Sequence, residues 1–208
     1  MMVVCDMGPL HYLVLIGCDH VLPALFDRVL TARVVVDKEM NDQETPEAVR
    51  RWAAAPPPWL EVRDPKHLMD IPSLGRAGER GDGDRAVISL AVEEHADFVL
   101  MDDVKARKQL VLKSRAHARE IDPLWTLEVL DEAADRGLIQ DLAERLAALE
   151  RQTPFYVGEK ARKVIEEMLR KDLARKRKHE QDRSTGTPEI PSPSPPEQKI
   201  RRGFGRER

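Results

Sequence analysis

Two short apolar segments of the chain each end in acidic residues, and this repeated pattern constrains the fold more than any other feature. Residues 2–5 (MVVC) precede Asp6, and residues 98–101 (FVLM) precede Asp102 and Asp103. Segments that are apolar throughout are typical of strands buried on both faces of a parallel sheet. The stretches between them have the apolar spacing of helices. Alternating strands and helices predict an α/β sandwich around a central, mostly parallel sheet.

The remaining organisation follows from local composition. We expect further strands near Val29, at residues 59–62 and at residues 118–121. The 208 residues are enough for one α/β domain of ordinary size, which we place at residues 1–180 and which includes the C-terminal helices. Residues 184–208 are rich in proline and serine and then basic. Such a segment cannot bury enough apolar surface to order itself, so a disordered tail is predicted there.

Cysteine usage and hydropathy indicate the compartment. The chain has two cysteines, Cys5 and Cys18, and no clustered Cys and His pattern typical of structural zinc sites. The N-terminus lacks the features of a signal peptide, and no apolar run approaches the ~20 residues of a membrane helix. We therefore expect a cytoplasmic protein with no membrane partner. The net charge of −3 means that a nucleic-acid surface would be a local patch.

The acidic residues at the strand ends allow two interpretations. Strands of a parallel sheet end at the same edge, so Asp6 would approach Asp102 and Asp103, with Glu39 and Asp84 close to that edge in the sequence. Taken singly, an Asp after a strand is more often a turn or helix cap, and a Glu on a helix is usually solvated. Taken together, the carboxylates would repel one another unless protons or cations intervene. Mg²⁺ and Mn²⁺ are the ions that prefer such oxygen ligands.

Four short motifs follow one another along the chain. They are DMGPL from Asp6, VDKEM around Glu39, GDRAVISLA around Asp84, and ADFVLMDD ending at Asp103. In this order they resemble the motifs D-T-[SG]-P-L, V-x-x-E-L, G-E-x-x-A-I-x-L-A and A-D-x-x-L-x-D-D of PIN-domain nucleases of the VapC toxin type. The stretch TLEVLDEAADRGLI also resembles a helix of that family. The resemblance covers roughly residues 2–170.

This resemblance implies a PIN-like α/β/α sandwich and metal-dependent cleavage of RNA that leaves a 5′-phosphate and a 3′-hydroxyl. The family's catalytic acids fall on Asp6, Glu39, Asp84 and Asp103. Its metal ligands for Mg²⁺ or Mn²⁺ fall on Asp6, Asp84 and the Asp102/Asp103 pair, and the choice within that pair is left open. The implied partners are RNA, a protein antitoxin of a toxin–antitoxin module and a second copy of the chain.

Two residues depart from the family pattern. Met7 stands where a Thr or Ser hydroxyl usually supports the first Asp, and Asp84 replaces the Glu common in this subgroup. These departures keep a second hypothesis open, a catalytically weakened PIN-fold binding protein that acts through RNA or protein partners. A phosphotransfer domain of the receiver type is a third hypothesis. It fits poorly, because its acidic pair follows the first strand and a Lys follows the last.

A basic stretch follows the acidic pair. No acidic residue occurs between Lys105 and Arg119, and a basic flank is what an acidic site needs in order to attract the RNA backbone. The ordinary alternative is a solvated helix face. The candidate RNA-binding residues are Lys105, Arg107, Lys108, Lys113 and Arg115.

Overall fold

The computed structural model describes residues 1–74, 82–153 and 158–184. The chain separates into two compact units, Met1–Thr126 and Leu127–Arg208. The predicted tail lies outside the described residues except for Ser184, which is the last residue of a helix. Its disorder therefore stays a prediction.

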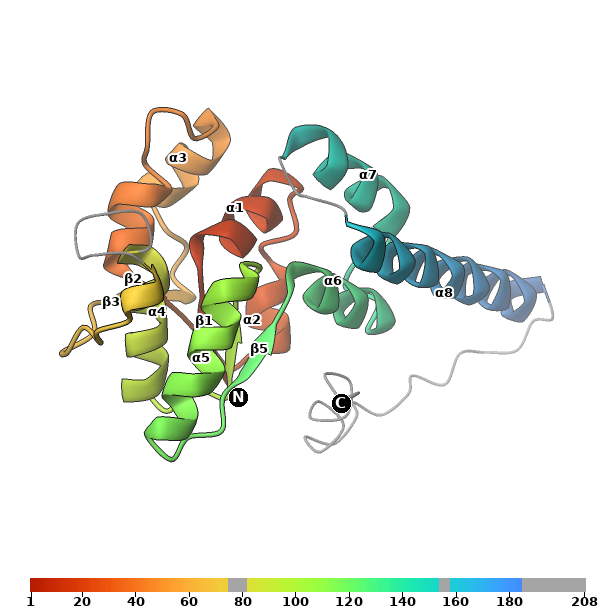
Figure 1. Cartoon of the computed structure of the whole chain (residues 1–208). Helices are drawn as coiled ribbons and strands as arrows, with labels where there is room; N and C mark the ends of the chain where they lie inside the picture. Colours follow the sequence, from red (N-terminus) through yellow and green to blue (C-terminus); the bar gives the residue numbers. More distant parts are fainter. Residues whose placement is uncertain (75–81, 154–157, 185–208) are drawn as a thin grey trace. The chain divides into compact units, whose positions relative to one another are not determined.

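The first unit is built on a five-stranded sheet in which all neighbouring strands are parallel (Figure 1). The strands are β1 (Met2–Cys5), β2 (Arg28–Ala32), β3 (Leu60–Arg63), β4 (Phe98–Leu100) and β5 (Asp122–Leu124). Their spatial order is β3-β2-β1-β4-β5. This arrangement confirms the predicted α/β sandwich, and the sheet is wholly parallel within the described residues.

The last strand lies later in the sequence than predicted. The expectation of a strand at residues 118–121 was wrong, because Ala118 has a positive φ of 52° in the turn that follows a helix. The strand begins at Asp122, which pairs with Phe98, and it contains Pro123. Proline disfavours central strands, but β5 is an edge strand and has no ladder bond to lose on its outer side.

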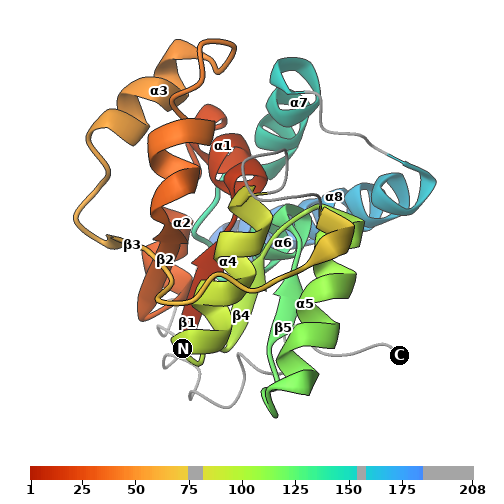
Figure 2. The same ribbon diagram turned by 60° about the vertical axis from the view of Figure 1, so that its left-hand side comes forward.

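Helices cover both faces of the sheet. The helices of this unit are α1 (Met7–Leu15), α2 (Val21–Leu25), α3 (Glu47–Ala54), α4 (Asp82–Glu93) and α5 (Val104–Ala116). Figure 2 shows α4 beside α5 on one face, and α1 packs beside α3 on the other. A π-helical turn, Val35–Glu39, follows β2, and a 3₁₀ turn, Pro72–Leu74, precedes α4.

The core lies between the central strands and these helices. Val3, Val4, Leu30 and Val99 have no more than a trace of exposed surface, as expected for strands covered on both faces. Cys5 is buried among them, and burial raises the pKa of its thiol well above the usual range. A buried, protonated thiol of this kind behaves as a small apolar side chain.

The strand order reverses between β1 and β4. The chain leaves β1 to form β2 and β3 on one side, then crosses over to form β4 and β5 on the other. Parallel crossovers are right-handed, so the helices after β1 and after β4 lie on opposite faces. The carboxyl ends of β1 and β4 therefore open into the crevice where α/β sheets bind their ligands.

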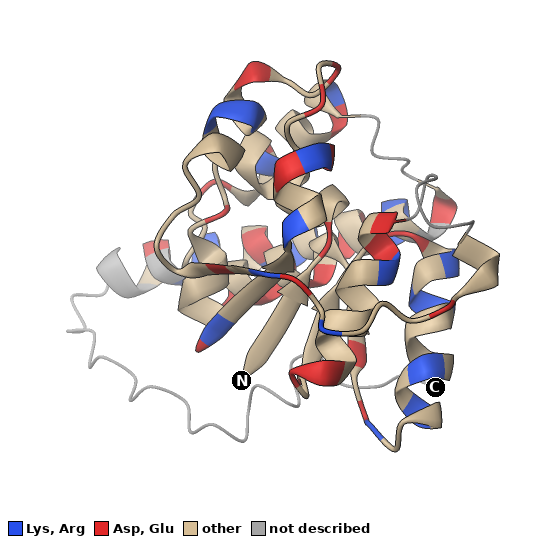
Figure 3. Ribbon diagram, turned by 90° about the vertical axis from the view of Figure 1, so that its left-hand side faces the viewer, with Lys and Arg blue, Asp and Glu red and all other residues tan. Residues whose placement is uncertain are grey.

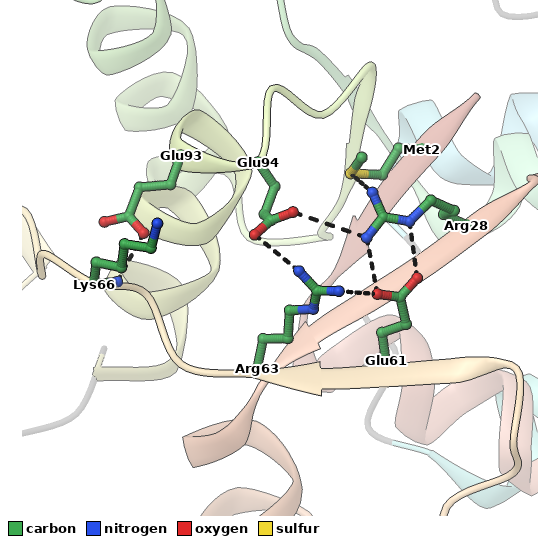
Figure 4. A network of polar contacts seen from close by, with 7 residues as sticks. All are labelled: Met2, Arg28, Glu61, Arg63, Lys66, Glu93 and Glu94. Atoms are coloured by element: carbon green, nitrogen blue, oxygen red, sulfur yellow. Dashed lines mark hydrogen bonds and ion pairs between the residues drawn. The ribbon is translucent and has the colours of Figure 1, made fainter.

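A network of ion pairs joins β2 and β3 to the residue that follows α4 (Figure 4). Arg28 donates through Nε and Nη2 to the two carboxylate oxygens of Glu61, both at 2.8 Å. Arg63 donates to Glu61 at 2.6 Å and to Glu94 at 3.1 Å. The Arg28 guanidinium also lies 3.8 Å from Glu94. Each carboxylate in this network faces guanidinium groups.

The second unit is helical in its described part. It contains α6, which begins at the boundary (Thr126–Asp135), α7 (Leu142–Gln152) and α8 (Glu159–Ser184). Ion pairs from Asp131 to Lys171 and from Asp135 to Arg175 join α6 to α8. Among the described residues, no helix is long and apolar enough to cross a membrane.

Candidate metal centre at the carboxyl edge of the sheet

Asp6 directly follows β1 at the reversal of strand order. Its backbone N–H donates to the carbonyl oxygen of Leu100 at 2.9 Å, which ties the end of β1 to the end of β4. The residue is only 8% exposed, although it carries a carboxylate. It stands at the N-cap position of α1, but its side chain makes no capping hydrogen bond. Helix capping therefore does not account for this buried acid.

Asp102 follows β4 by two residues, and Thr126 donates hydrogen bonds to both of its carboxylate oxygens. Its Oδ1 accepts a hydrogen bond from the backbone N–H of Thr126 at 2.9 Å, and its Oδ2 accepts one from the Thr126 hydroxyl at 2.6 Å. The pairing of β4 with β5 brings these residues together, because Met101 N–H donates to Leu124 O at 3.0 Å. Burial raises the pKa of Asp102, and the Thr126 hydrogen bonds act against that rise.

Asp103, unlike Asp102, is hydrogen-bonded by a residue close to it in the sequence. It is the N-cap of α5, and its Oδ1 accepts a hydrogen bond from Ala106 N–H at 2.8 Å. This contact is the ordinary capping interaction of an Asp at a helix start. The charge of Asp103 still reaches the site, because after burial it is the second cause that raises the pKa of Asp84.

Asp84 lies in the first turn of α4 and is not its cap, since the helix begins at Asp82. Burial and the neighbouring Asp103 raise the pKa of Asp84 from 3.8 to about 6. Close to neutral pH, part of the Asp84 population is therefore still protonated in the metal-free protein. Perturbed pKa values of this kind gather at functional sites.

Glu39 reaches the same place from the π-helical turn after β2. Its carboxylate lies over the start of α4, where the backbone N–H of Gly83 hydrogen-bonds to it. A Cβ atom on Gly83 would lie 2.3 Å from Glu39 Oε2, so only glycine permits this approach. Burial and then the charge of Asp84 raise the pKa of Glu39.

The structure brings the predicted acids into one electrostatic group. The pKa of Asp6 rises well above its ordinary value, first through burial and then through the charges of Asp84, Glu39 and, more weakly, Asp102. The backbone N–H of Met7 acts in the opposite direction. Like charges at these positions disfavour full ionisation unless a cation balances them.

The donor set suits a hard divalent cation, because it consists of carboxylate oxygens around a buried acid. Over residues 1–74, 82–153 and 158–184, however, no three or more Asp, Glu, His or Cys side chains are arranged to hold a metal ion. The donor chemistry of these residues therefore fits a metal, whereas their side-chain positions do not enclose one.

Two further side chains face this group. The pKa of Tyr12, on α1, is raised by burial and then by Asp102 and Asp6, which places its phenol near both carboxylates. Burial raises the pKa of Asp102, and the charge of Arg107, on α5, acts against that rise. The Arg107 guanidinium lies 4.8 Å from the centroid of the Trp125 ring, a cation–π contact that holds the charge beside the site.

The predicted RNA-binding residues lie along α5, where Figure 3 shows basic segments on the helix ribbon. Lys105, Lys108 and Arg115 are exposed and share one face of the helix with the exposed Leu112. Lys113 donates to the carbonyl oxygen of Asp70 at 2.7 Å. The helix thus offers an exposed basic face next to the acids, and RNA contact there stays a prediction.

Several residues of this site were not among the sequence-based candidates. Thr126 and Trp125 lie directly after β5 and were hidden because that strand was expected earlier in the chain. Gly83 belongs to the motif GDRAVISLA, where its lack of a side chain was a readable signal. Tyr12 had no distinctive signal, since an aromatic residue on an amphipathic helix usually belongs to the core.

The sequence model of a family described as a PIN domain matches residues 2–172. The chain therefore belongs to the PIN-domain family. Proteins of this class are generally nucleases, hydrolases that generally use divalent metals. The match spans parts of both compact units, and the predicted single domain over residues 1–180 stays a prediction. No curated protein and no solved structure matches the chain.

Proposed function

We propose that this PIN-domain protein is a metal-dependent endoribonuclease of the VapC type. The observation that carries the proposal is the group of acids at the reversal of strand order, where burial and then the charges of Asp84, Glu39 and Asp102 raise the pKa of Asp6. An isolated cap would not be buried beside three other carboxylates. Carboxylates that repel one another at a site for a polyanion are accounted for if they bind a cation, which balances their charge and that of the phosphate.

The proposed roles follow from position. Asp6, Asp84 and the Asp102/Asp103 pair would hold Mg²⁺ or Mn²⁺. Glu39 would bind the metal through a water molecule or orient the attacking water. A divalent ion held by these acids would lower the pKa of a bound water and would neutralise charge on the phosphate. No side chain needs to act as a covalent nucleophile.

Basic residues would guide the RNA backbone to the acids. Lys105, Lys108 and Arg115 are exposed on α5, and Arg107 is held against Trp125 beside Asp102. Phosphate contacts position a nucleic acid without reading its sequence. This surface therefore supports a nucleic acid as the class of substrate, and the choice of RNA rests on the VapC-type motifs.

The VapC-type motifs extend the proposal to biology. We place the enzyme in the cytoplasm as the toxin of a toxin–antitoxin module, with a protein antitoxin as its partner and with a second copy of the chain in a homodimer. These partners rest on the motifs alone.

A catalytically weakened binding protein is the second candidate, and Met7 favours it. Met7 begins α1 next to Asp6 and has no hydroxyl to offer that carboxylate. In this case the protein would bind RNA through α5 and leave it uncut. Binding and cleavage must therefore be measured separately.

The test is cleavage of a mixed RNA substrate with Mn²⁺, with Mg²⁺ and with EDTA. The endoribonuclease proposal predicts metal-dependent 5′-phosphate products, which Asp84→Asn abolishes. The matched control is Asp37→Asn, which removes an exposed carboxylate near Glu39 and should leave cleavage unchanged. RNA binding without cleavage under any metal would favour the weakened binding protein.

A further inference from the structure

Thr126 makes a two-point contact with one acid of the site. It is fully buried, its backbone N–H donates to Asp102 Oδ1 at 2.9 Å, and its hydroxyl donates to Asp102 Oδ2 at 2.6 Å. Two donors on one residue fix both the position and the plane of the carboxylate. Each oxygen retains a lone pair with which it can bind a cation.

We propose that Thr126 is a positioning residue that holds the Asp102 carboxylate for metal binding, an inference that rests on the proposed function. Residues that orient a metal ligand from behind are part of how proteins tune a metal site. Here the partner lies 24 residues away in the sequence, and the pairing of β4 with β5 delivers it.

The contact differs from ordinary helix capping. A threonine at a helix start usually accepts a hydrogen bond from the backbone of its own helix. The Thr126 hydroxyl instead donates to the carboxylate of Asp102, which lies outside its helix. The backbone N–H of Thr126 has no acceptor within its own helix, because it belongs to the first turn, and it also donates to Asp102. The pair therefore links the segment after β5 to the segment after β4 through the acid, within the first unit.

The same comparison separates Asp102 from Asp103. Asp103 caps its own helix through Ala106, and it is exposed. Asp102 is less exposed than Asp103. It accepts its hydrogen bonds from Thr126, which does not belong to the helix that follows Asp102. Within the adjacent pair, Asp102 is therefore the carboxylate held for metal binding, whereas Asp103 is engaged by the backbone of its own helix.

The experiment measures Mn²⁺ affinity by titration calorimetry on the full chain. Thr126→Val removes the hydroxyl at nearly constant shape, and we expect Mn²⁺ binding to weaken about 10-fold or more, the usual effect of removing a residue that orients a metal ligand. Thr126→Ser keeps the hydroxyl and should bind Mn²⁺ nearly as tightly as wild type. If Thr126→Val does not fold, Thr126→Ala removes the hydroxyl with less bulk.

The matched control is Thr31→Val. Thr31 is equally buried, and its hydroxyl donates to the Cys5 carbonyl at 2.8 Å, with no acid involved. We expect this variant to lose stability and to keep its Mn²⁺ affinity. Wild-type Mn²⁺ affinity in the hydroxyl-free Thr126 variants would overturn the inference, as would a wild-type protein that binds no Mn²⁺.

The outcome is separable from that of the proposed function. A protein that binds Mn²⁺ but cuts no RNA refutes the endoribonuclease proposal, and the loss of Mn²⁺ affinity in Thr126→Val would still support the positioning of Asp102. A protein that cuts RNA equally well with and without the Thr126 hydroxyl, at unchanged Mn²⁺ affinity, refutes the positioning alone.

Discussion

The first unit holds its acidic residues in two contrasting ways. At the carboxyl edge of the sheet, Asp6 lies beside other carboxylates, and its pKa is raised by burial and by them. In the network of Figure 4, Glu61 lies between Arg28 and Arg63, and a hydrogen bond from Arg28 is the first cause that lowers its pKa. The same chemical group is therefore destabilised as an anion in one place and stabilised in the other.

The difference shows what each region is built for. The ion-pair network is complete within the chain and joins an edge strand to the end of α4, so its charges stabilise the fold modestly. In the carboxylate group, burial and the neighbouring acids oppose the charges of Asp6, Glu39 and Asp84, and burial opposes the charge of Asp102. Stability that is given up at one place in a fold usually marks a functional site.

The largest effect that would break this contrast comes from Gly83→Ala. The new Cβ would lie within 2.6 Å of three carboxylate atoms of Glu39, so the flexible Glu39 side chain must move away. A displacement of about 1 Å at a reacting site can reduce the rate ~100-fold. Alanine also favours the helix over glycine by about 1 kcal/mol. Cleavage assays and urea unfolding should therefore show an enzyme that is less active but no less stable; full activity would show that the position of Glu39 does not matter.

A change of intermediate size is expected from Asp84→Asn in the metal-free protein. The folded-state pKa of about 6 lies above the ordinary 3.8, so the folded protein binds the extra proton and loses stability as the pH rises between these values. Asp84→Asn removes the carboxylate charge and therefore removes this loss of stability. Urea unfolding at pH 7.5 should find the variant more stable than wild type by on the order of 2 kcal/mol, with the advantage shrinking toward pH 4. An advantage that does not depend on pH would contradict the raised pKa of Asp84 in the folded protein.

The smallest effect is expected from Glu61→Gln, in the paired region. The lowered pKa of Glu61 means that its contribution is present above the ordinary value of 4.5 and is lost as the pH falls below it. Because the side chain is about a third exposed, we expect a loss of about 1 kcal/mol or less at pH 7. Added salt and acid should both reduce this difference between variant and wild type. A gain in stability at pH 7 would erase the contrast between the two regions.

The sequence predicts the frame of the molecule from its apolar runs. The segments before Asp6 and Asp102 are apolar throughout, so they had to be buried strands, and a parallel sheet then brings their ends to one edge. The position of β5 could not be predicted from the sequence, because Pro123 disfavours a strand. A proline is acceptable there only because β5 lies at the edge of the sheet.

The site was predictable as a set of acids but not as a geometry. Strand ends give Asp6 and Asp102, whereas Glu39 depends on a π-helical turn formed by a β-branched run that by propensity favours strand. The contact of Thr126 with Asp102 depends on the register of β4 against β5, which no local pattern encodes. Long-range register is the part of the site that only the folded chain supplies.

The most direct test of the central claim, that repelling carboxylates await a cation, is a set of four melting curves: wild type and Asp6→Asn, each with and without Mn²⁺. Without metal, Asp6→Asn should melt at a higher temperature than wild type, because one of the opposing charges is gone. Mn²⁺ should raise the melting temperature of wild type and raise that of Asp6→Asn much less, since a ligand stabilises only the state that binds it. A metal-free variant no more stable than wild type, together with equal Mn²⁺ shifts in the two proteins, would contradict the account.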